Sequence, residues 1–204
     1  MESKNINFDV MDIPNGTIGN WTVETFEVPE HSIENIRLAF KPGCRTVKPG
    51  IYKQLTRSGT LIMSNTPSEK SDYRHFIRKA TGNVLVNGLG LGCVLADLLN
   101  KTEIIKVTVI EISSDVISLI GPYFNKNSRV EIVCADAFKW NPPKGKRFNA
   151  VWHDIWDNIC TDNLPEMTRL HRKYGRKTDW QDSWCKQLCK MYKERDKRAQ
   201  QRWY

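Results

Sequence analysis

Glycines stand at every second position of the stretch GLGLG, and this spacing is suited to binding a nucleotide. Gly88, Gly90 and Gly92 lie between a continuous apolar run and a helix-like segment. Glycine permits positive φ angles and lets a ligand approach the backbone, and the start of the following helix offers free N–H groups. We therefore predict a nucleotide-binding loop that contains these glycines and Leu89.

Two acidic residues end the apolar runs that follow this loop. Glu111 lies 19 residues after Gly92, where a carboxylate accepts hydrogen bonds from two ribose hydroxyls. Asp136 ends the next run, where it is placed to accept from an adenine amino group, with Ala137 against the base. Because the carboxyl ends of parallel strands meet at one edge of a sheet, we predict a site for an adenosine-containing ligand. The loop lacks the GxGxxG spacing, so a nicotinamide dinucleotide is less well served.

The stretch AVWHDIWDNI combines two acids with two indoles. Burying an unpaired carboxylate costs several kcal/mol or raises its pKa. A carboxylate can take the proton of an amine that must become a nucleophile, and the indoles of Trp152 and Trp156 can hold a cationic amine or sulfonium. We therefore predict that Asp154 and Asp157 are catalytic residues that act on such an amine. The alternative is two core tryptophans, with Asp157 or Thr161 capping the next helix.

A regular alternation of strands and helices must position these residues. The runs NVLVNG, IKVTVIEI, RVEIVCADAF and FNAVWHDI are typical of buried parallel strands. Helices are expected at CVLADLLN and SDVISLIGPYF, the second capped by Ser113 or Ser114. Before them we expect a strand at WTVETFEV, a hairpin around Ser58 and Gly59, and a helix over 68–81. The order predicts an α/β fold with a Rossmann-like, doubly wound parallel sheet and a small N-terminal β-region.

The end of the chain carries no strong strand signal after Ile159. We expect helices over 164–174 and 180–198, so that the sheet is shortened on its C-terminal side. The predicted regions are an N-terminal β-rich region 1–67, a Rossmann-like core 68–160 and a basic helical segment 161–204.

Composition limits the class of protein and its compartment. The chain is 40% hydrophobic and 26% charged, which is ordinary for a globular domain. It has no apolar run of the roughly 18 residues that span a bilayer, and its start has no apolar stretch of a secretory signal. We therefore expect a cytoplasmic protein without a membrane partner. The six cysteines form no CxxC pair, so we expect reduced thiols and no metal site.

Positive charge is concentrated at the end of the chain. The net charge is +8, and residues 165–204 contain 12 Lys and Arg against 5 Asp and Glu, a balance of +7. Such a tail fits either nucleic acid or the solvated face of a helix. The sequence leaves homo-oligomerisation open.

The stretch from about Gly59 to Leu164 resembles the class I S-adenosylmethionine (AdoMet)-dependent transferases, and most closely their spermidine-synthase branch. The resemblance is carried by GLGLGCVL, by EISSDVI, by the Asp136–Ala137 pair and by the D-x-x-D of Asp154 and Asp157. It implies AdoMet or decarboxylated AdoMet as cofactor. The implied cofactor-binding residues are Gly88, Leu89, Gly90, Gly92, Glu111, Ile112, Asp136 and Ala137.

The resemblance also implies roles for residues around the acceptor. In the spermidine-synthase branch, the aspartate that matches Asp154 orients and deprotonates an attacking amine, and the one that matches Asp157 helps to bind it. Tyr73 and His75 lie near the place of that branch's Tyr-His-Glu substrate motif. The implied substrate-binding residues are therefore Trp152, Trp156, Tyr73 and His75.

Two departures separate the chain from both templates. Leu91 stands where spermidine synthases carry an acid that seats decarboxylated AdoMet, and Val86 stands where methyltransferases carry an acid before the loop. The leading hypothesis is therefore an AdoMet-dependent methyltransferase with an unknown small-molecule acceptor, such as an amine. The alternatives are aminopropyl transfer to a polyamine, and a non-catalytic nucleoside-binding protein whose basic tail binds nucleic acid.

Overall fold

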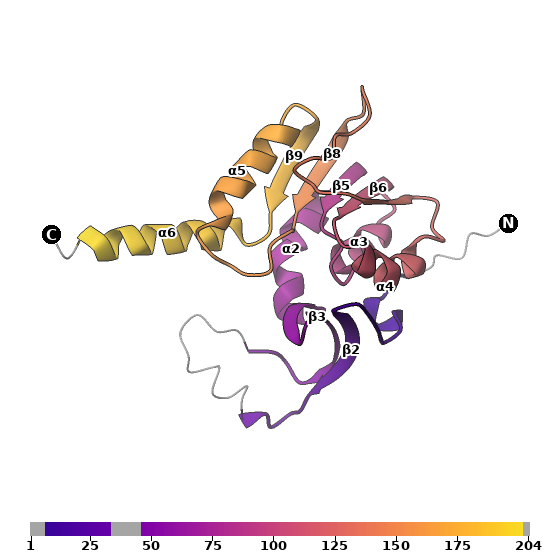
Figure 1. The fold of residues 1–204 in the computed structure, drawn as a ribbon, viewed down its shortest axis with the longest axis vertical. Coiled ribbons are helices and arrows are strands. Elements are labelled where there is room, and N and C mark those ends of the chain that lie inside the picture. The colour runs from indigo at the N-terminus through magenta and orange to yellow at the C-terminus, as the bar shows by residue number, and fades with distance from the viewer. Residues whose placement is uncertain (1–6, 34–45, 202–204) are drawn as a thin grey trace.

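Two β-sheets organise the part of the chain that the computed structural model describes, residues 7–33 and 46–201. A four-stranded antiparallel sheet comes first in the sequence, and a five-stranded parallel sheet flanked by helices follows it (Figure 1). The predicted Rossmann-like α/β fold with a small N-terminal β-region is confirmed. The five cysteines within the described residues are free thiols, and Cys44 lies outside them.

The antiparallel sheet contains a hairpin whose turn is set by two left-handed residues. Ser58 and Gly59 have φ angles of 49° and 78°, as a turn that follows the right-handed twist of a hairpin requires. The predicted hairpin and the predicted strand at WTVETFEV are both confirmed. The elements, with the strands paired in sequence order, are η1 (Val10–Asp12), β1 (Gly16–Ile18), β2 (Trp21–Val28), β3 (Gly50–Arg57) and β4 (Thr60–Ser64).

The parallel sheet has the strand order β7-β6-β5-β8-β9, and helices connect its strands. Its second connecting helix begins after Ser113, whose hydroxyl accepts a hydrogen bond from the N–H of Val116 at 3.3 Å, so this predicted cap is confirmed. The elements are α2 (Pro67–Lys79), β5 (Gly82–Asn87), α3 (Cys93–Leu99), β6 (Ile104–Glu111), α4 (Ser114–Phe124), β7 (Val130–Cys134), β8 (Phe148–His153), α5 (Asn163–Tyr174), β9 (Thr178–Ser183) and α6 (Lys186–Gln201).

The central strands are apolar on both faces because helices cover both. Val84 and Val86 of β5 pack into a core that α2, α3 and α4 share with the antiparallel sheet. Leu85, between them, points to the opposite face and packs with Leu170 and Tyr174 of α5. This two-sided burial explains why the strand reads as a continuous apolar run rather than as an alternating one.

Strand β9 corrects the prediction that no strand follows Ile159. It pairs in parallel with β8, from Phe148 opposite Thr178 onward, in a stretch where the sequence pattern predicts the start of a helix over 180–198. The sheet is therefore one strand longer than predicted, and the helix begins only at α6. The pairing with β8 supplies backbone hydrogen bonds that local sequence does not reveal.

Buried and half-buried polar side chains join β9 to the rest of the sheet. His153 is fully buried; its Nδ1 accepts from the side-chain amide of Asn87 at 2.8 Å, and its Nε2–H donates to Gln181 at 3.0 Å. His171 of α5 bonds the hydroxyl of Ser183 at 2.8 Å. Burial lowers the pKa of His153 to about 3, so the ring is neutral at physiological pH. These bonds tie β5, β8, β9 and α5 together directly beneath the ends of the strands.

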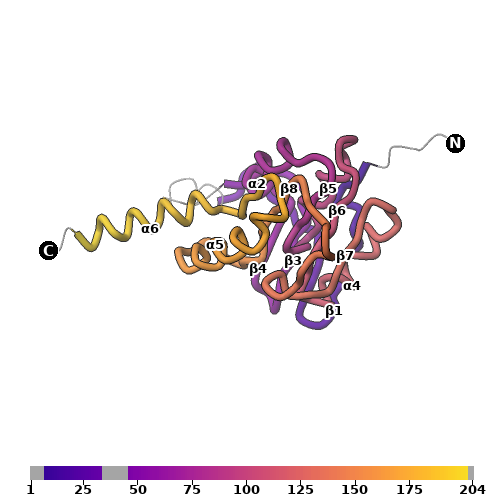
Figure 2. The backbone as a smooth tube through the Cα atoms, turned by 90° about the horizontal axis from the view of Figure 1, so that it is seen from above, coloured from indigo at the N-terminus to yellow at the C-terminus, as the bar shows by residue number. Residues whose placement is uncertain are grey.

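The topology leaves a crevice at one edge of the parallel sheet. Strand β5 has β6 on one side and β8 on the other, so the chain diverges at its carboxyl end, and ligands of doubly wound sheets bind at such switch points. The antiparallel sheet packs against α4, and α6 projects away from the body in both views (Figures 1 and 2). Within the described residues, no helix combines the length and apolar character needed to cross a bilayer.

Candidate active site

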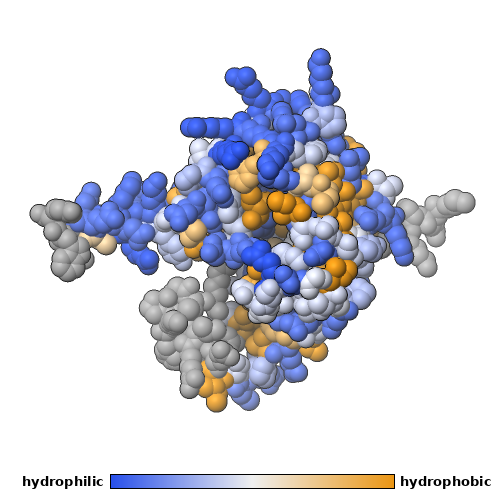
Figure 3. All heavy atoms as spheres, viewed as in Figure 1, coloured by the Kyte–Doolittle hydropathy of each residue, from blue (hydrophilic) through white to orange (hydrophobic). Residues whose placement is uncertain are grey.

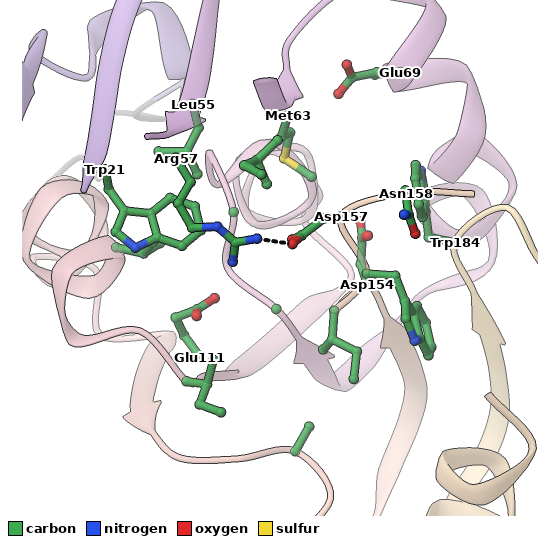
Figure 4. A pocket seen from close by; sticks show the side chains of 18 of the residues that line it. Trp21, Leu55, Arg57, Met63, Glu69, Glu111, Asp154, Asp157, Asn158 and Trp184 are labelled. Atoms are coloured by element: carbon green, nitrogen blue, oxygen red, sulfur yellow. Dashed lines mark hydrogen bonds and ion pairs between the residues drawn. The ribbon is translucent and has the colours of Figure 1, made fainter. Parts of the chain in front are cut away.

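A cavity of about 580 Å³ opens at the carboxyl ends of β5, β6 and β8. The loops after these strands form one wall, and the β3–β4 hairpin and the first turns of α2 contribute the facing residues (Figure 4). Its place at the switch point of the sheet is where the sequence predicts a ligand site. The predicted site residues that line it are Gly88, Gly90, Glu111, Ile112, Ala137, Asp154, Trp156 and Asp157.

The first glycine of the loop allows two strand ends to approach each other. Gly88 has a φ of 99°, and a Cβ atom on it would lie 1.9 Å from the carbonyl oxygen of Asp154. The N–H of Asp154 in turn donates to the carbonyl of Asn87 at 2.8 Å. Gly92, with a φ of 81°, packs against Phe124, so it supports the loop from behind rather than lining the cavity. Gly88 therefore holds the loop against the end of β8 and Gly92 holds it against α4, in contacts that only glycine tolerates.

Glu111 joins the glycine loop to the end of β6. Its carboxylate is buried and accepts the backbone N–H of Leu89 at 2.8 Å and that of Ser113 at 2.8 Å, one on each oxygen. Leu89 thus takes part through its backbone and does not line the cavity. Each carboxylate oxygen has two lone pairs, so both retain the capacity to accept a further hydrogen bond from the cavity.

The turn after β7 places alanines rather than an acid in the cavity. Asp136 accepts the N–H of Phe138 at 2.8 Å and lies 3.7 Å from the ammonium of Lys139. Its side chain therefore orders the turn, and it does not line the cavity, whereas Ala135 and Ala137 on either side of it do. The predicted contact between Asp136 and an adenine amino group stays a prediction.

Asp154 lies at the floor of the cavity in a largely dry setting. The indole N–H of Trp152 donates to its Oδ2 at 3.3 Å, while the ring itself is in the core, with its centroid 5.0 Å from that of Phe76. Burial raises the pKa of Asp154 to about 7; the Trp152 bond opposes this rise, and the charges of Glu69 and Asp72 add to it. Trp152 therefore supports the carboxyl group from behind. It does not line the cavity, although the sequence predicts a substrate-binding residue at this position.

Asp157 meets a partner from the antiparallel sheet. It forms an ion pair with Arg57 at the end of β3, and the guanidinium also lies 5.3 Å from the ring centroid of Trp21 (Figure 4). Neither Asp157 nor Thr161 caps α5, which starts after Asp162 without a side-chain cap bond. The alternative that Asp157 or Thr161 caps the next helix is therefore wrong.

The remaining predicted substrate residues lie in different surroundings. Trp156 lines the cavity, and its indole N–H donates to Glu166 at 2.7 Å. Tyr73 is buried in the core, and His75 is exposed on α2, where it meets Trp180 edge-on with ring centroids 5.9 Å apart. Neither Tyr73 nor His75 lines the cavity, and their predicted role in substrate binding stays a prediction.

Several lining residues were not predicted from the sequence. Glu69 of α2 accepts both the N–H and the hydroxyl of Ser64, at 2.7 Å and 2.9 Å, and faces the cavity beside Asp72. Trp184, which follows β9, and Arg57 also line the cavity. They come from segments far apart in the sequence, and no local motif marks them. The only available signal was an acid in the first turn of a helix, which usually serves the helix itself.

Comparison with known proteins gives likeness in structure only. No family model and no curated protein matches the chain. Among solved structures, it is similar to the N-methyltransferase NodS from Bradyrhizobium japonicum WM9, at 14% identity over 56% of this chain and 64% of that chain, with a TM-score of 0.44. A complex of that protein with S-adenosyl-L-homocysteine is similar at 17% identity over 52% of this chain and 52% of that chain, with a TM-score of 0.40. The CcbJ methyltransferase from Streptomyces caelestis is similar at 17% identity over 54% of this chain and 45% of that chain, with a TM-score of 0.42.

In each of these comparisons the matched region is less than two thirds of the other protein. The strand order and pairing of this chain themselves define its Rossmann-like fold.

Substituting the first glycine tests the close approach of the two strand ends. Gly59 has a similar φ of 78° with open space around it, so Gly59→Ala should cost about 1 kcal/mol of stability from backbone strain alone. Gly88→Ala adds the clash with the Asp154 carbonyl and should cost at least about 2 kcal/mol more. Chemical denaturation measures both. Equal costs for the two variants would show that the loop does not depend on this contact.

The dry setting of Asp154 makes a prediction about pH. Its pKa of about 7 in the folded protein lies above the unfolded value of 3.8, so the folded state holds the proton between these values and its ionised form costs stability above pH 7. Asp154→Asn removes this cost. As the pH rises from 5 to 8, the free energy of unfolding of the variant should increase relative to that of the wild type. The expected increase is about 2 kcal/mol after allowance for the partial exposure of Asp154.

Chemical denaturation of both proteins at each pH measures this difference in the free energy of unfolding. The histidines are present in both proteins, so their contributions to the pH dependence cancel in the difference. A difference that stays constant from pH 5 to pH 8 would mean that Asp154 is ionised throughout.

Proposed function

We propose that this protein is an AdoMet-dependent transferase, and that it transfers the methyl group to a basic nitrogen of a small molecule. The observation that carries the proposal is one cavity that holds both Glu111, fixed by the glycine loop, and Asp154, whose pKa lies near neutrality. Glu111 is suited to binding a nucleoside, and Asp154 is suited to accepting a proton. A purely structural crevice gives no reason for both to be there.

The nucleoside half of the cavity fits the adenosine of AdoMet. Glu111 presents two oxygens with spare acceptor capacity, which matches the two hydroxyls of a ribose. Ile112, Val116, Ala135 and Ala137 supply an apolar surface on the same side, as the flat face of a base requires. When bound, AdoMet supplies a methyl carbon attached to a sulfonium, which a nitrogen lone pair can attack.

The acceptor half fits a protonated amine. Asp154, Glu69 and Asp72 bring negative charge to one side of the cavity, where Trp156 and Trp184 provide indole surfaces. An ammonium has no lone pair for attack, so its proton must leave before transfer. Asp154, held by Trp152, is placed to accept that proton, because a base with a pKa near the working pH is the most effective. Aminopropyl transfer to a polyamine would use the same two halves.

Titration with an adenosine thioether tests the cofactor site. Isothermal titration of the wild type with S-adenosylhomocysteine should give binding, and Glu111→Gln should weaken it 10- to 100-fold, or about 1.5–3 kcal/mol for a lost charged hydrogen-bond partner. Glu131→Gln is the control, because Glu131 carries the same group on β7 and pairs with Lys106 at 2.8 Å away from the cavity. If neither S-adenosylhomocysteine nor AdoMet binds the wild type, the proposal fails.

A second candidate function, nucleic-acid binding, has an observation of its own. Helix α6 projects from the body, and hydrophilic residues cover much of its visible side (Figure 3). Lys186, Lys190, Lys193 and Lys197 recur at spacings of four, three and four, which places them on one face of the helix. A row of lysines along a projecting helix suits contact with a phosphate backbone.

Salt dependence distinguishes a phosphate-binding face from a solvated one. If the row binds nucleic acid, the logarithm of the affinity for a short duplex should fall linearly with the logarithm of the salt concentration. Changing Lys190, Lys193 and Lys197 to Gln should reduce that slope by about 2 to 3. The same change at the exposed Lys126, Lys139 and Lys144 is the control, with an equal loss of charge. Absent binding, or an equal reduction in both variants, would make α6 a solvated helix.

A further inference from the structure

The charges that line the cavity are unequal in a way that bears on the choice of ligand. Five carboxylates face it, from Glu69, Asp72, Glu111, Asp154 and Asp157. Among the described lining residues, a single cation faces them, and it is Arg57. Among the described lining residues, Arg57 is therefore the side chain that can receive a negative group of a ligand.

Arg57 lies between the two halves of the cavity. In Figure 4 its pair with Asp157 is drawn between Glu111 on one side and Glu69 and Asp154 on the other. The side chains of Arg57 and Asp157 are 46% and 44% exposed. An exposed ion pair contributes little to stability, so replacing Asp157 by another anion costs little free energy. The contact with Trp21 keeps the guanidinium in this place when the partner changes.

We propose that Arg57 receives the α-carboxylate of the cofactor, in place of Asp157, and so selects AdoMet over its decarboxylated form. The inference rests on the proposed function and decides between its two reactions. The amino-acid end of AdoMet carries one ammonium and one carboxylate, whereas the decarboxylated form carries the ammonium alone. A guanidinium presents a planar fork of donors that matches a carboxylate. Arg57 thus favours the cofactor of methyl transfer.

The exchange has a consequence for the acceptor. While Arg57 is paired with Asp157, the charge of that carboxylate is neutralised. When the carboxylate of the cofactor replaces Asp157 as the partner of Arg57, Asp157 is released beside Asp154, where it can receive the ammonium of the acceptor. Binding of the cofactor and binding of the acceptor should therefore reinforce each other, since a coupling between two sites is reciprocal.

Titration with a matched pair of ligands tests this assignment. S-adenosylhomocysteine and its decarboxylated analogue differ only in the carboxylate. The wild type should bind the former at least tenfold more tightly, and Arg57→Gln should abolish this preference while changing the affinity for the decarboxylated analogue less than threefold. Asp157→Asn should leave the preference in place and tighten S-adenosylhomocysteine about threefold, because Arg57 no longer has a competing partner.

Arg147→Gln is the matched control for these variants. Arg147 is exposed and pairs with Asp179 at 3.1 Å, away from the cavity, so this substitution should change neither affinity. If the wild type binds both ligands with equal affinity, the assignment of Arg57 is wrong. It is also wrong if Arg57→Gln weakens the binding of both ligands equally, because the residue would then only hold the hairpin in place. If the wild type binds neither ligand, the proposed function itself fails.

Discussion

The backbone contact between Gly88 and Asp154 is the constraint on which the site depends. No side chain fits between the end of β5 and the carbonyl after β8, and the reverse bond from the Asp154 N–H to Asn87 closes the same junction. Because the two strand ends are locked together, the glycine loop and the Asp154 carboxyl group keep a fixed relation. Beneath them, His153 and its partners hold the strands in register.

Three carboxylates in this cavity are suited to three different tasks because their surroundings differ. Glu111 accepts two backbone N–H groups, which hold it rigidly as an acceptor for neutral hydroxyls. Asp154 has one indole donor and a dry setting, which bring its pKa close to neutrality. Asp157 is half exposed and paired with Arg57, so its charge can be exchanged. In the function we propose, the same chemical group would bind the nucleoside, take up a proton and receive the ammonium of the acceptor in one cavity.

Much of the fold could be predicted from the sequence, because buried parallel strands and glycine loops have local signatures. The four apolar runs became β5 to β8, and the glycine loop and Glu111 lie together at their ends, as predicted. Strand β9 could not be predicted, since its residues are mostly polar and its hydrogen bonds are made with β8 and with the side chains of His153 and His171. Its stability comes from partners, not from its own pattern.

The other side of the cavity could not be predicted at all. Trp21 and Arg57 reach the site because the antiparallel sheet packs on α4, and Glu69 reaches it from the first turn of α2; no spacing in the chain reveals either contact. Trp152 and Trp156 look equivalent in the sequence. The first lies inside a strand and points into the core, whereas the second lies beyond the strand end and faces the opening.

Competition between cofactors tests the central claim most directly. The protein is dialysed to equilibrium against an equimolar mixture of AdoMet, decarboxylated AdoMet, NAD and ATP, and mass spectrometry measures which of them is enriched on the protein side. The account predicts enrichment of AdoMet above the other three. Enrichment of NAD or ATP, or of none of the four, would contradict it.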